Sequence, residues 1–146
     1  EKKDKNPSLI FTNQQDRDKN KLKEARALNS YQIGKYKDAI KYLDKINQSN
    51  INKIEKNKIA YLKANAYFNL GELEKSEKIL ESILLKKENN LSDDALLLQG
   101  MILKQKGKKE EALNVFTQLA SEYPNSEFYE SAQIQKRILT VKKNDK

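Results

Sequence analysis

Apolar residues recur along the chain at helical spacing, in stretches that are separated by polar turns. The clearest stretch ends at Pro124 and predicts two helices joined by a tight turn at Gly107, since glycine tolerates the left-handed backbone of a helix end. Gly100 on the first helix and Ala112 on the second are small, so the two backbones can approach closely. Phe116 is large and apolar and is expected to fill the space beside them.

The same pattern predicts seven helices in all. The first is expected at about residues 14–33, after a capping box of Thr12 and Gln15, the third at about 51–70 and the seventh at about 126–141. Ser92 and Ser126 are expected to cap the fifth and seventh helices. The expected organisation is a flexible or extended tail at 1–13, a helical repeat domain at 14–141 and a flexible C-terminus at 142–146.

The core-facing side of each helix follows from the same spacing. For most helices the stripes coincide with the repeat described below. Beyond that repeat, we expect these residues to face the core: Leu22, Ala25, Leu28 and Tyr31 on the first helix, Ile54, Ile59, Leu62 and Ala66 on the third, and Ala132, Gln135, Ile138 and Leu139 on the seventh.

A repeat with a period of 36–37 residues is the strongest signal in the sequence. Its turn glycines, Gly34, Gly71 and Gly107, are 37 and 36 residues apart. Small residues stand seven before and five after each glycine, and larger apolar ones stand nine and twelve after it. In that order the columns are Ala27, Ala64 and Gly100; Ala39, Ser76 and Ala112; Leu43, Leu80 and Phe116; Ile46, Ile83 and Leu119. A generic helical hairpin would need the apolar stripes but not small residues at fixed offsets from the turn.

These columns resemble the tetratricopeptide repeat (TPR) family, whose unit is a helix–turn–helix of about 34 residues. The resemblance covers about residues 20–139 and implies an all-α, right-handed superhelical stack of three helix pairs plus a C-terminal capping helix. The large residue that the family has eleven before the turn glycine is Lys23, Ala60 and Leu96 here, so only the third unit approaches the pattern, and the terminal proline is present only as Pro124. The seventh helix is either a solvating cap or the first half of a further unit. The junction Glu122–Ala132 resembles a bacterial envelope subtype, which includes the lipoprotein subunit of outer-membrane assembly machinery and the repeat protein of the Tol–Pal system.

The residue types present argue against catalysis. The chain has no cysteine and no histidine, which removes most nucleophilic triads and transition-metal sites. The paired carboxylates Asp93/Asp94 and Glu110/Glu111 both open predicted helices, where they complement the helix dipole. We therefore expect no enzyme activity, no metal and no cofactor.

The charge bears on possible partners. The formal net charge is +8, but the cations are almost all lysines and are spread along every helix. A solvated basic surface is favoured over a nucleic-acid site, because lysine lacks the bidentate fork of specific phosphate and base recognition. No apolar run is long enough to span a bilayer. The chain begins at Glu1 without methionine, so we expect a mature or trimmed form, with membrane attachment only through an unseen anchor or a partner.

The TPR resemblance implies that the first helix of each unit lines a concave groove for a partner peptide or domain. The third helix is the most informative, because Tyr61 and Phe68 lie seven residues apart and Asn65 and Asn69 four apart on one side. Aromatic rings beside amides suit a bound peptide. The alternative is that Tyr61 and Phe68 pack against a neighbouring helix. The expected partner-binding residues are Tyr31, Lys58, Tyr61, Asn65, Phe68, Asn69, Leu97, Met101 and Lys104, with Lys21 and Glu24 among the further lining positions.

The sequence thus predicts a non-enzymatic scaffold or adaptor for a protein partner, in the bacterial periplasm or envelope. Lysines at the groove rim would steer an acidic partner. Two alternatives stay open: a basic binder of anionic membrane or nucleic acid, and a self-assembling structural module. The partner's identity and the oligomeric state are left open.

Overall fold

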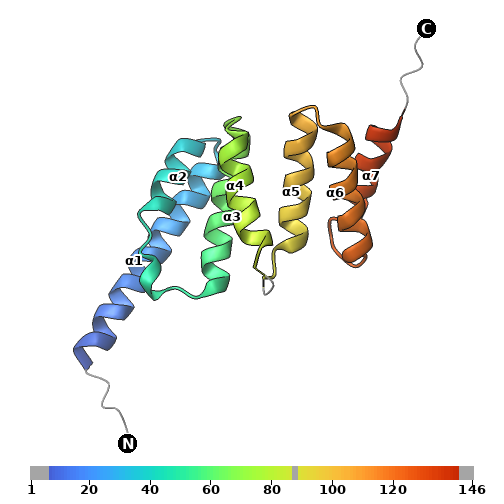
Figure 1. Cartoon of the computed structure of the whole chain (residues 1–146). Helices are drawn as coiled ribbons and strands as arrows, with labels where there is room; N and C mark the ends of the chain where they lie inside the picture. The colour runs from blue at the N-terminus through green and yellow to red at the C-terminus, as the bar shows by residue number, and fades with distance from the viewer. Residues whose placement is uncertain (1–6, 87–88, 142–146) are drawn as a thin grey trace, which may run out of the picture.

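The computed structural model describes the backbone of residues 7–86 and 89–141, and the side chains in these ranges except those of residues 7–13 and 50. This part of the chain is all-helical and contains no strand. Its elements are α1 (Pro7–Gln32), α2 (Tyr36–Asp44), the 3₁₀ turn η1 (Gln48–Asn50), α3 (Lys53–Asn69), α4 (Leu73–Leu84), α5 (Ser92–Gln105), α6 (Lys109–Glu122) and α7 (Tyr129–Thr140). The helices follow one another across the molecule in chain order, as a helical repeat stack requires (Figure 1).

Three helix pairs are joined by the predicted glycine turns. Gly34, Gly71 and Gly107 have φ of 78°, 77° and 78°, the left-handed region that glycine enters without steric cost. After α1, for example, the Lys35 amide donates to the Ser30 carbonyl at 2.8 Å, so the turn satisfies a carbonyl at the helix end. The pairs α1/α2, α3/α4 and α5/α6 are therefore the repeat units, and α7 packs on α6.

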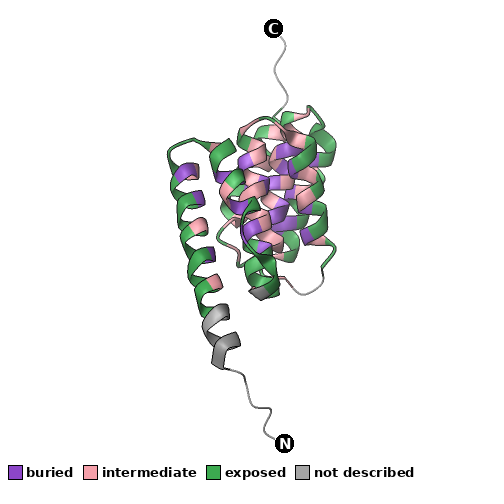
Figure 2. Ribbon diagram, turned by 90° about the vertical axis from the view of Figure 1, so that its left-hand side faces the viewer, coloured by how far each residue is buried: buried purple, intermediate pink, exposed green. Residues whose placement is uncertain are grey.

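The predicted columns form the centre of each pair. The small residues of both columns, together with Leu80, Ile83, Phe116 and Leu119, are buried. Figure 2 shows in purple that buried residues line the helix faces between the helices. A Cβ built on Gly100 would lie 2.5 Å from the Phe116 ring, so only glycine fits there. Ser76 is also fully buried, and its hydroxyl donates to the Ala64 carbonyl at 2.7 Å, which satisfies the one polar group of the columns.

A second set of contacts stacks each pair on the one before. Ile59 and Leu62 of α3 pack with Leu43 and Ile46 at the end of α2. Ala95 and Leu98 of α5, 36 residues after Ile59 and Leu62, pack in the same way with Leu80 and Ile83 of α4, which lie 37 residues after Leu43 and Ile46. We call this repeated contact the stacking interface.

The start of α1 corrects the sequence prediction. The helix begins at Pro7, because proline's fixed φ and missing N–H suit the first helical position. Thr12 therefore lies inside α1, and the predicted capping box with Gln15 and the predicted tail at residues 7–13 are wrong. The predicted flexible segments at residues 1–6 and 142–146 lie outside the described residues.

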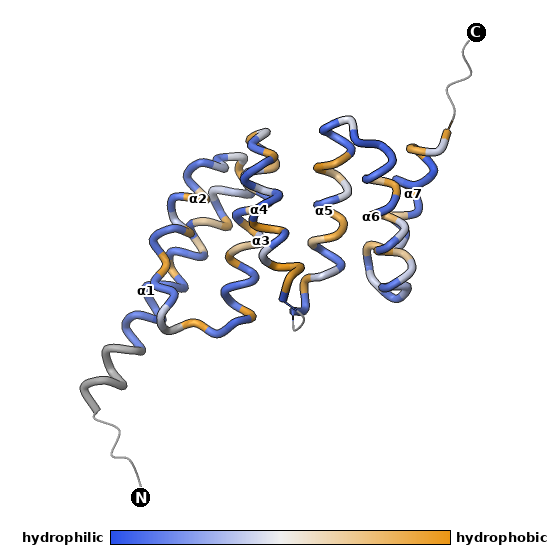
Figure 3. The backbone as a smooth tube through the Cα atoms, in the orientation of Figure 1, coloured by the Kyte–Doolittle hydropathy of each residue, from blue (hydrophilic) through white to orange (hydrophobic). Residues whose placement is uncertain are grey.

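The predicted apolar side of α1 is also wrong. Leu22 is 53% exposed, Leu28 is 42% exposed and Ala25 is exposed, whereas Asn20 and Ala27 are buried. Leu22 and Ala25 occupy the repeat positions of Ile59 and Leu62, the α3 residues that pack on the preceding helix α2. No described helix precedes α1, so nothing in the described structure covers these positions. Figure 3 shows that much of α1 is hydrophilic, in keeping with a helix that is covered along one side only.

Ile54 and Ile138 are likewise 54% and 52% exposed, contrary to the prediction. Lys63 of α3 pairs with Asp44, the last residue of α2, at 2.6 Å. Ile54 lies nine residues earlier, so α3 extends beyond the end of α2 at that point. Ile138 lies six residues after the buried Ala132, which at 3.6 residues per turn places it about 120° away around α7.

Two predicted caps are replaced by loop contacts. Leu91 and Phe128 precede α5 and α7, neither with a side-chain cap. Ser92 donates to Asn89 at 2.9 Å, and Ser126 accepts from the Phe128 amide at 3.0 Å, so both serines order the loops before these helices. A capping box that the sequence prediction missed starts α3, where Asn52 and Glu55 each bond the other's backbone amide.

None of the helices in the described ranges has both the length and the apolar character of a membrane span.

Candidate functional site

The predicted lining residues lie on the odd-numbered helices, and contacts connect them from one helix to the next. The Asn69 side-chain amide on α3 donates to the Tyr31 hydroxyl on α1 at 3.2 Å. The ring of Tyr31 meets that of Tyr36 edge to face, with centroids 5.2 Å apart. Tyr31 is thus held against both its own unit and the next.

The two asparagines of α3 present carboxamide groups beside these rings. Asn65 donates to the Tyr61 carbonyl at 3.0 Å, and Asn69 donates to the Asn65 carbonyl at 2.9 Å. Neither side-chain oxygen accepts a hydrogen bond from a described residue. Both oxygens are therefore available to a donor such as a partner's backbone N–H.

Tyr61 and Phe68 are half-buried rather than free. Both pack partly against the core cluster that contains Ala64 and Leu80. Burial raises the pKa of Tyr61, an effect opposed by its hydrogen bond with Asn65 and reinforced by the charge of Asp94 on α5. One part of each ring thus packs against neighbouring helices, as the alternative prediction had it, and the other part is exposed at the surface.

Asp94 forms an acidic corner beside Tyr61. The pKa of Asp94 is raised to about 6, mainly by burial. The charge of Asp93, a hydrogen bond with Asp93 and the charge of Glu127 raise it further, and a backbone hydrogen bond opposes the shift. Asp93 accepts a hydrogen bond from the Ser126 hydroxyl, which ties the loop before α7 to the start of α5. Negative charge is therefore concentrated where the surface passes from α3 to α5.

We expect this corner to make stability depend on pH. Because the folded-state pKa of Asp94 is raised above its ordinary value of 3.8, its stabilising contribution is complete below about pH 4 and is lost as pH rises towards 6. Asp94→Asn should remove this loss, so the urea midpoint of the variant should exceed that of the wild type at pH 7.5. Equal urea midpoints of the two proteins at pH 7.5 would contradict this prediction. So would a difference between the two midpoints that stays the same from pH 4 to pH 6.5.

The other predicted residues differ in their surroundings. Leu97 and Met101 are half-buried against the α5/α6 core. Lys104 donates to Gln135 on α7 at 2.8 Å, so its ammonium group is engaged within the fold. Lys58 is exposed.

Two functional candidates on α7 were missed by the sequence reasoning. Ala132 is fully buried against α6, as Ala95 is against α4, and the two are 37 residues apart. The same offset places Ile134 in the register of Leu97, and Ile138 in that of Met101. Both isoleucines are more than half exposed, so they continue the apolar row onto α7. This offset was the signal in the sequence that could have identified them. We call Tyr31, Tyr61, Asn65, Asn69, Leu97, Met101, Ile134 and Ile138 the lining face.

A cavity of about 420 Å³ lies between α1 and the start of α3. Its walls include the predicted lining positions Lys21 and Glu24, and its apolar floor includes Ile46 and Ile59. Asn20, which was not among the predicted site residues, also lines the cavity and joins α1 to the loop after α2. Its side chain donates to the Asn47 carbonyl at 2.8 Å and accepts from the Asn47 amide at 3.0 Å, and a lone asparagine on a helix gives no sequence signal of that role.

Within the described ranges, no group of three or more carboxylates could hold a metal ion. The surface is instead a row of aromatic, amide and apolar side chains, the chemistry of a protein-binding face.

Comparison with known families agrees with this geometry. Two models described as tetratricopeptide repeat match the chain, one at residues 58–85 and the other at residues 94–126. They fall on α3/α4 and on α5/α6, the second and third helix pairs. The chain therefore contains tetratricopeptide repeats, which generally mediate protein–protein interactions and are typically non-catalytic. No curated protein matches the chain.

Proposed function

We propose that this protein is a non-catalytic scaffold or adaptor that holds a partner protein along the lining face. The observation that carries the proposal is the continuity of that face across α3, α5 and α7. One row passes from Tyr61 to Leu97 and Ile134, and the next from Asn65 to Met101 and Ile138, at offsets of 36 and 37 residues. A partner segment lying across the helices would meet every unit in turn.

The side chains of the lining face suit a peptide segment. The exposed isoleucines and the half-buried rings offer apolar area, at about 25 cal/mol per Å² removed from water. The oxygens of Asn65 and Asn69 can accept hydrogen bonds from a peptide backbone. Apolar contact thus supports affinity, and the amides favour one orientation of the bound chain.

Charge along the lining face bears on the partner's sequence. Lys21 and Lys58 occupy equivalent positions on α1 and α3, and Asp94 occupies that position on α5. We therefore propose a partner segment that is acidic where it crosses the first two units and basic or neutral at α5. A role in bacterial envelope assembly or maintenance, with a periplasmic location, is part of this proposal and depends on the Glu122–Ala132 junction alone.

The test uses the exposed residues of the lining face, because replacing Tyr61 and Phe68 would also disturb the core. We expect Ile134→Ser/Ile138→Ser to retain the wild-type circular dichroism and to lower partner retention about tenfold, which corresponds to about 1.4 kcal/mol. Retention is measured by quantitative mass spectrometry of proteins captured from a native extract.

Leu85→Ser is the matched control, because Leu85 is 83% exposed and lies after α4, away from the lining face. It should leave capture unchanged. Equal capture by the double variant and the wild type would refute the proposed binding face.

A further inference from the structure

The outer side of α1 carries an uncovered surface whose residues occupy the same repeat positions as the α3 residues of the stacking interface. Leu22 and Ala25 lie 37 residues before Ile59 and Leu62, which pack on α2. Both α1 residues are exposed, and so is Ile33 at 60%. We call Leu22, Ala25, Arg26 and Ile33 the end face.

The chain itself shows what kind of helix covers this register. At the end of α2 and in the turn that follows it, the covering residues belong to the sequence Leu-Asp-Lys-Ile (residues 43–46), and in α4 to Leu-Glu-Ser-Ile (residues 80–83). In both, two apolar residues three apart enter the stacking interface, and an acidic residue directly follows the first. The two helices thus share one short pattern of apolar and acidic positions.

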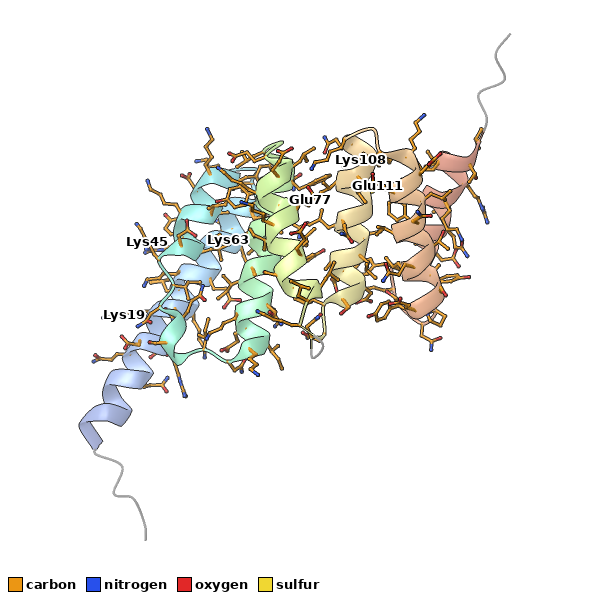
Figure 4. All side chains as sticks on the ribbon, in the orientation of Figure 1. Lys19, Lys45, Lys63, Glu77, Lys108 and Glu111 are labelled. Carbon is orange, nitrogen blue, oxygen red and sulfur yellow. The ribbon has the colours of Figure 1, made fainter. Side chains whose placement is uncertain are left out.

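In the contact between α2 and α3, the acidic position pairs with a cation on the following helix. Asp44 binds Lys63 at 2.6 Å, and Lys63 is the α3 counterpart of Arg26, 37 residues earlier. In the contact between α4 and α5, Glu81 of the pattern forms no ion pair with a described residue. A link of the same polarity comes from Glu77, four residues earlier, to Lys106 of α5 (Lys63 and Glu77 are labelled in Figure 4). Arg26 is exposed and forms no ion pair with any described residue. The end face therefore offers both the apolar and the cationic half of a stacking interface.

A folded second copy of the chain cannot present the pattern of α2 or α4. In a folded copy, the segments with this pattern are already covered by the following helix, and Leu43 and Leu80 are no more than 1% exposed. The outer side of α7 is also unsuitable for head-to-tail stacking. There Gln133, Arg137 and Thr140 stand 37 residues after Leu96, Gly100 and Leu103, so polar groups replace the residues that receive α6.

We propose that the end face binds an amphipathic helix of another protein that carries the apolar–acidic–x–apolar pattern of α2 and α4. The helix lies antiparallel to α1, buries its two apolar residues on Leu22 and Ala25, and pairs its carboxylate with Arg26. Binding extends the stack by one helix and does not use the lining face.

The probe is a fluorescein-labelled, hydrocarbon-stapled peptide with the sequence of residues 73–85, whose staple lies on the face away from Leu80 and Ile83. We expect saturable binding to the full chain by fluorescence anisotropy, with amide shift changes in ¹H–¹⁵N spectra concentrated around Leu22–Ile33. Leu22→Asp should weaken binding at least tenfold. Arg26→Glu should weaken it several-fold, and a peptide with lysine at the position of Glu81 should restore binding to that variant.

Ile138→Asp, on the lining face, is the matched control and should bind the peptide as the wild type does. Arg26 is exposed, so its variant provides the test even if Leu22→Asp fails to fold. No saturable binding, or binding unaffected by Leu22→Asp and Arg26→Glu, would overturn the proposal. Sedimentation showing a wild-type dimer that Leu22→Asp dissociates would also overturn it, by assigning the end face to a second copy.

Discussion

Phe116→Ala should lower the free energy of unfolding by about 3–5 kcal/mol, the largest effect expected from any single change considered for this protein. The Phe116 side chain is fully buried between α5 and α6 and contacts the cluster that also receives Ala132 of α7. Its removal leaves a cavity that Gly100, having no side chain, cannot fill. Urea unfolding followed by circular dichroism measures the change.

The partner position Gly100 gives the control for that result. Gly100→Ala in the wild type places a methyl group 2.5 Å from the Phe116 ring, so it should lower the free energy of unfolding. This holds although alanine is favoured over glycine within a helix by about 1 kcal/mol. In the Phe116→Ala background the clash is absent, and the same change should be neutral or stabilising. Additive effects of the two changes would mean that the residues do not share one site.

Asn20→Ala should cost about 2 kcal/mol, from about 1 kcal/mol for each of the two hydrogen bonds to Asn47. These bonds join the middle of α1, where Asn20 lines the cavity between α1 and α3, to the loop after α2. Losing them should also raise hydrogen exchange in α1 more than in α5. The measurements are urea unfolding and site-resolved exchange.

Asn29→Ala is the matched control, because Asn29 is exposed on the same helix. That change should alter stability by less than about 0.5 kcal/mol. An Asn20 variant no less stable than the Asn29 variant would show that the pair of bonds does not hold α1 in place.

The contacts within a pair could be predicted from the sequence because they depend on short-range geometry. The turn glycines and the small and large columns lie within a few residues of one turn, so their offsets determine which side chains meet. Gly71 and Ser76, five residues apart, illustrate this: one has the left-handed φ of the turn, and the other lies buried against Ala64. The lining position of Tyr61, in contrast, follows from the resemblance to tetratricopeptide repeats and stays a prediction.

The start of α1 and the exposed sides of the terminal helices could not be predicted in this way. Helical spacing shows that Leu22 and Ile138 lie on apolar stripes, but not whether another helix covers those stripes. The prediction assumed that every stripe is covered, and at the two ends of the stack this assumption fails. Leu22 is exposed because no described helix precedes α1, and Ile138 is 52% exposed on α7, the last helix of the described residues.

By itself, then, the sequence determined the repeat unit: its period, its turns and the residues at its centre. These are set by backbone conformation and by contacts between neighbours in the chain. Only the tertiary structure decided which surfaces remain open, namely the lining face that extends onto α7 and the end face on α1. Exposure depends on how many units stack and where the stack ends, and that information is not contained in the pattern of any single unit.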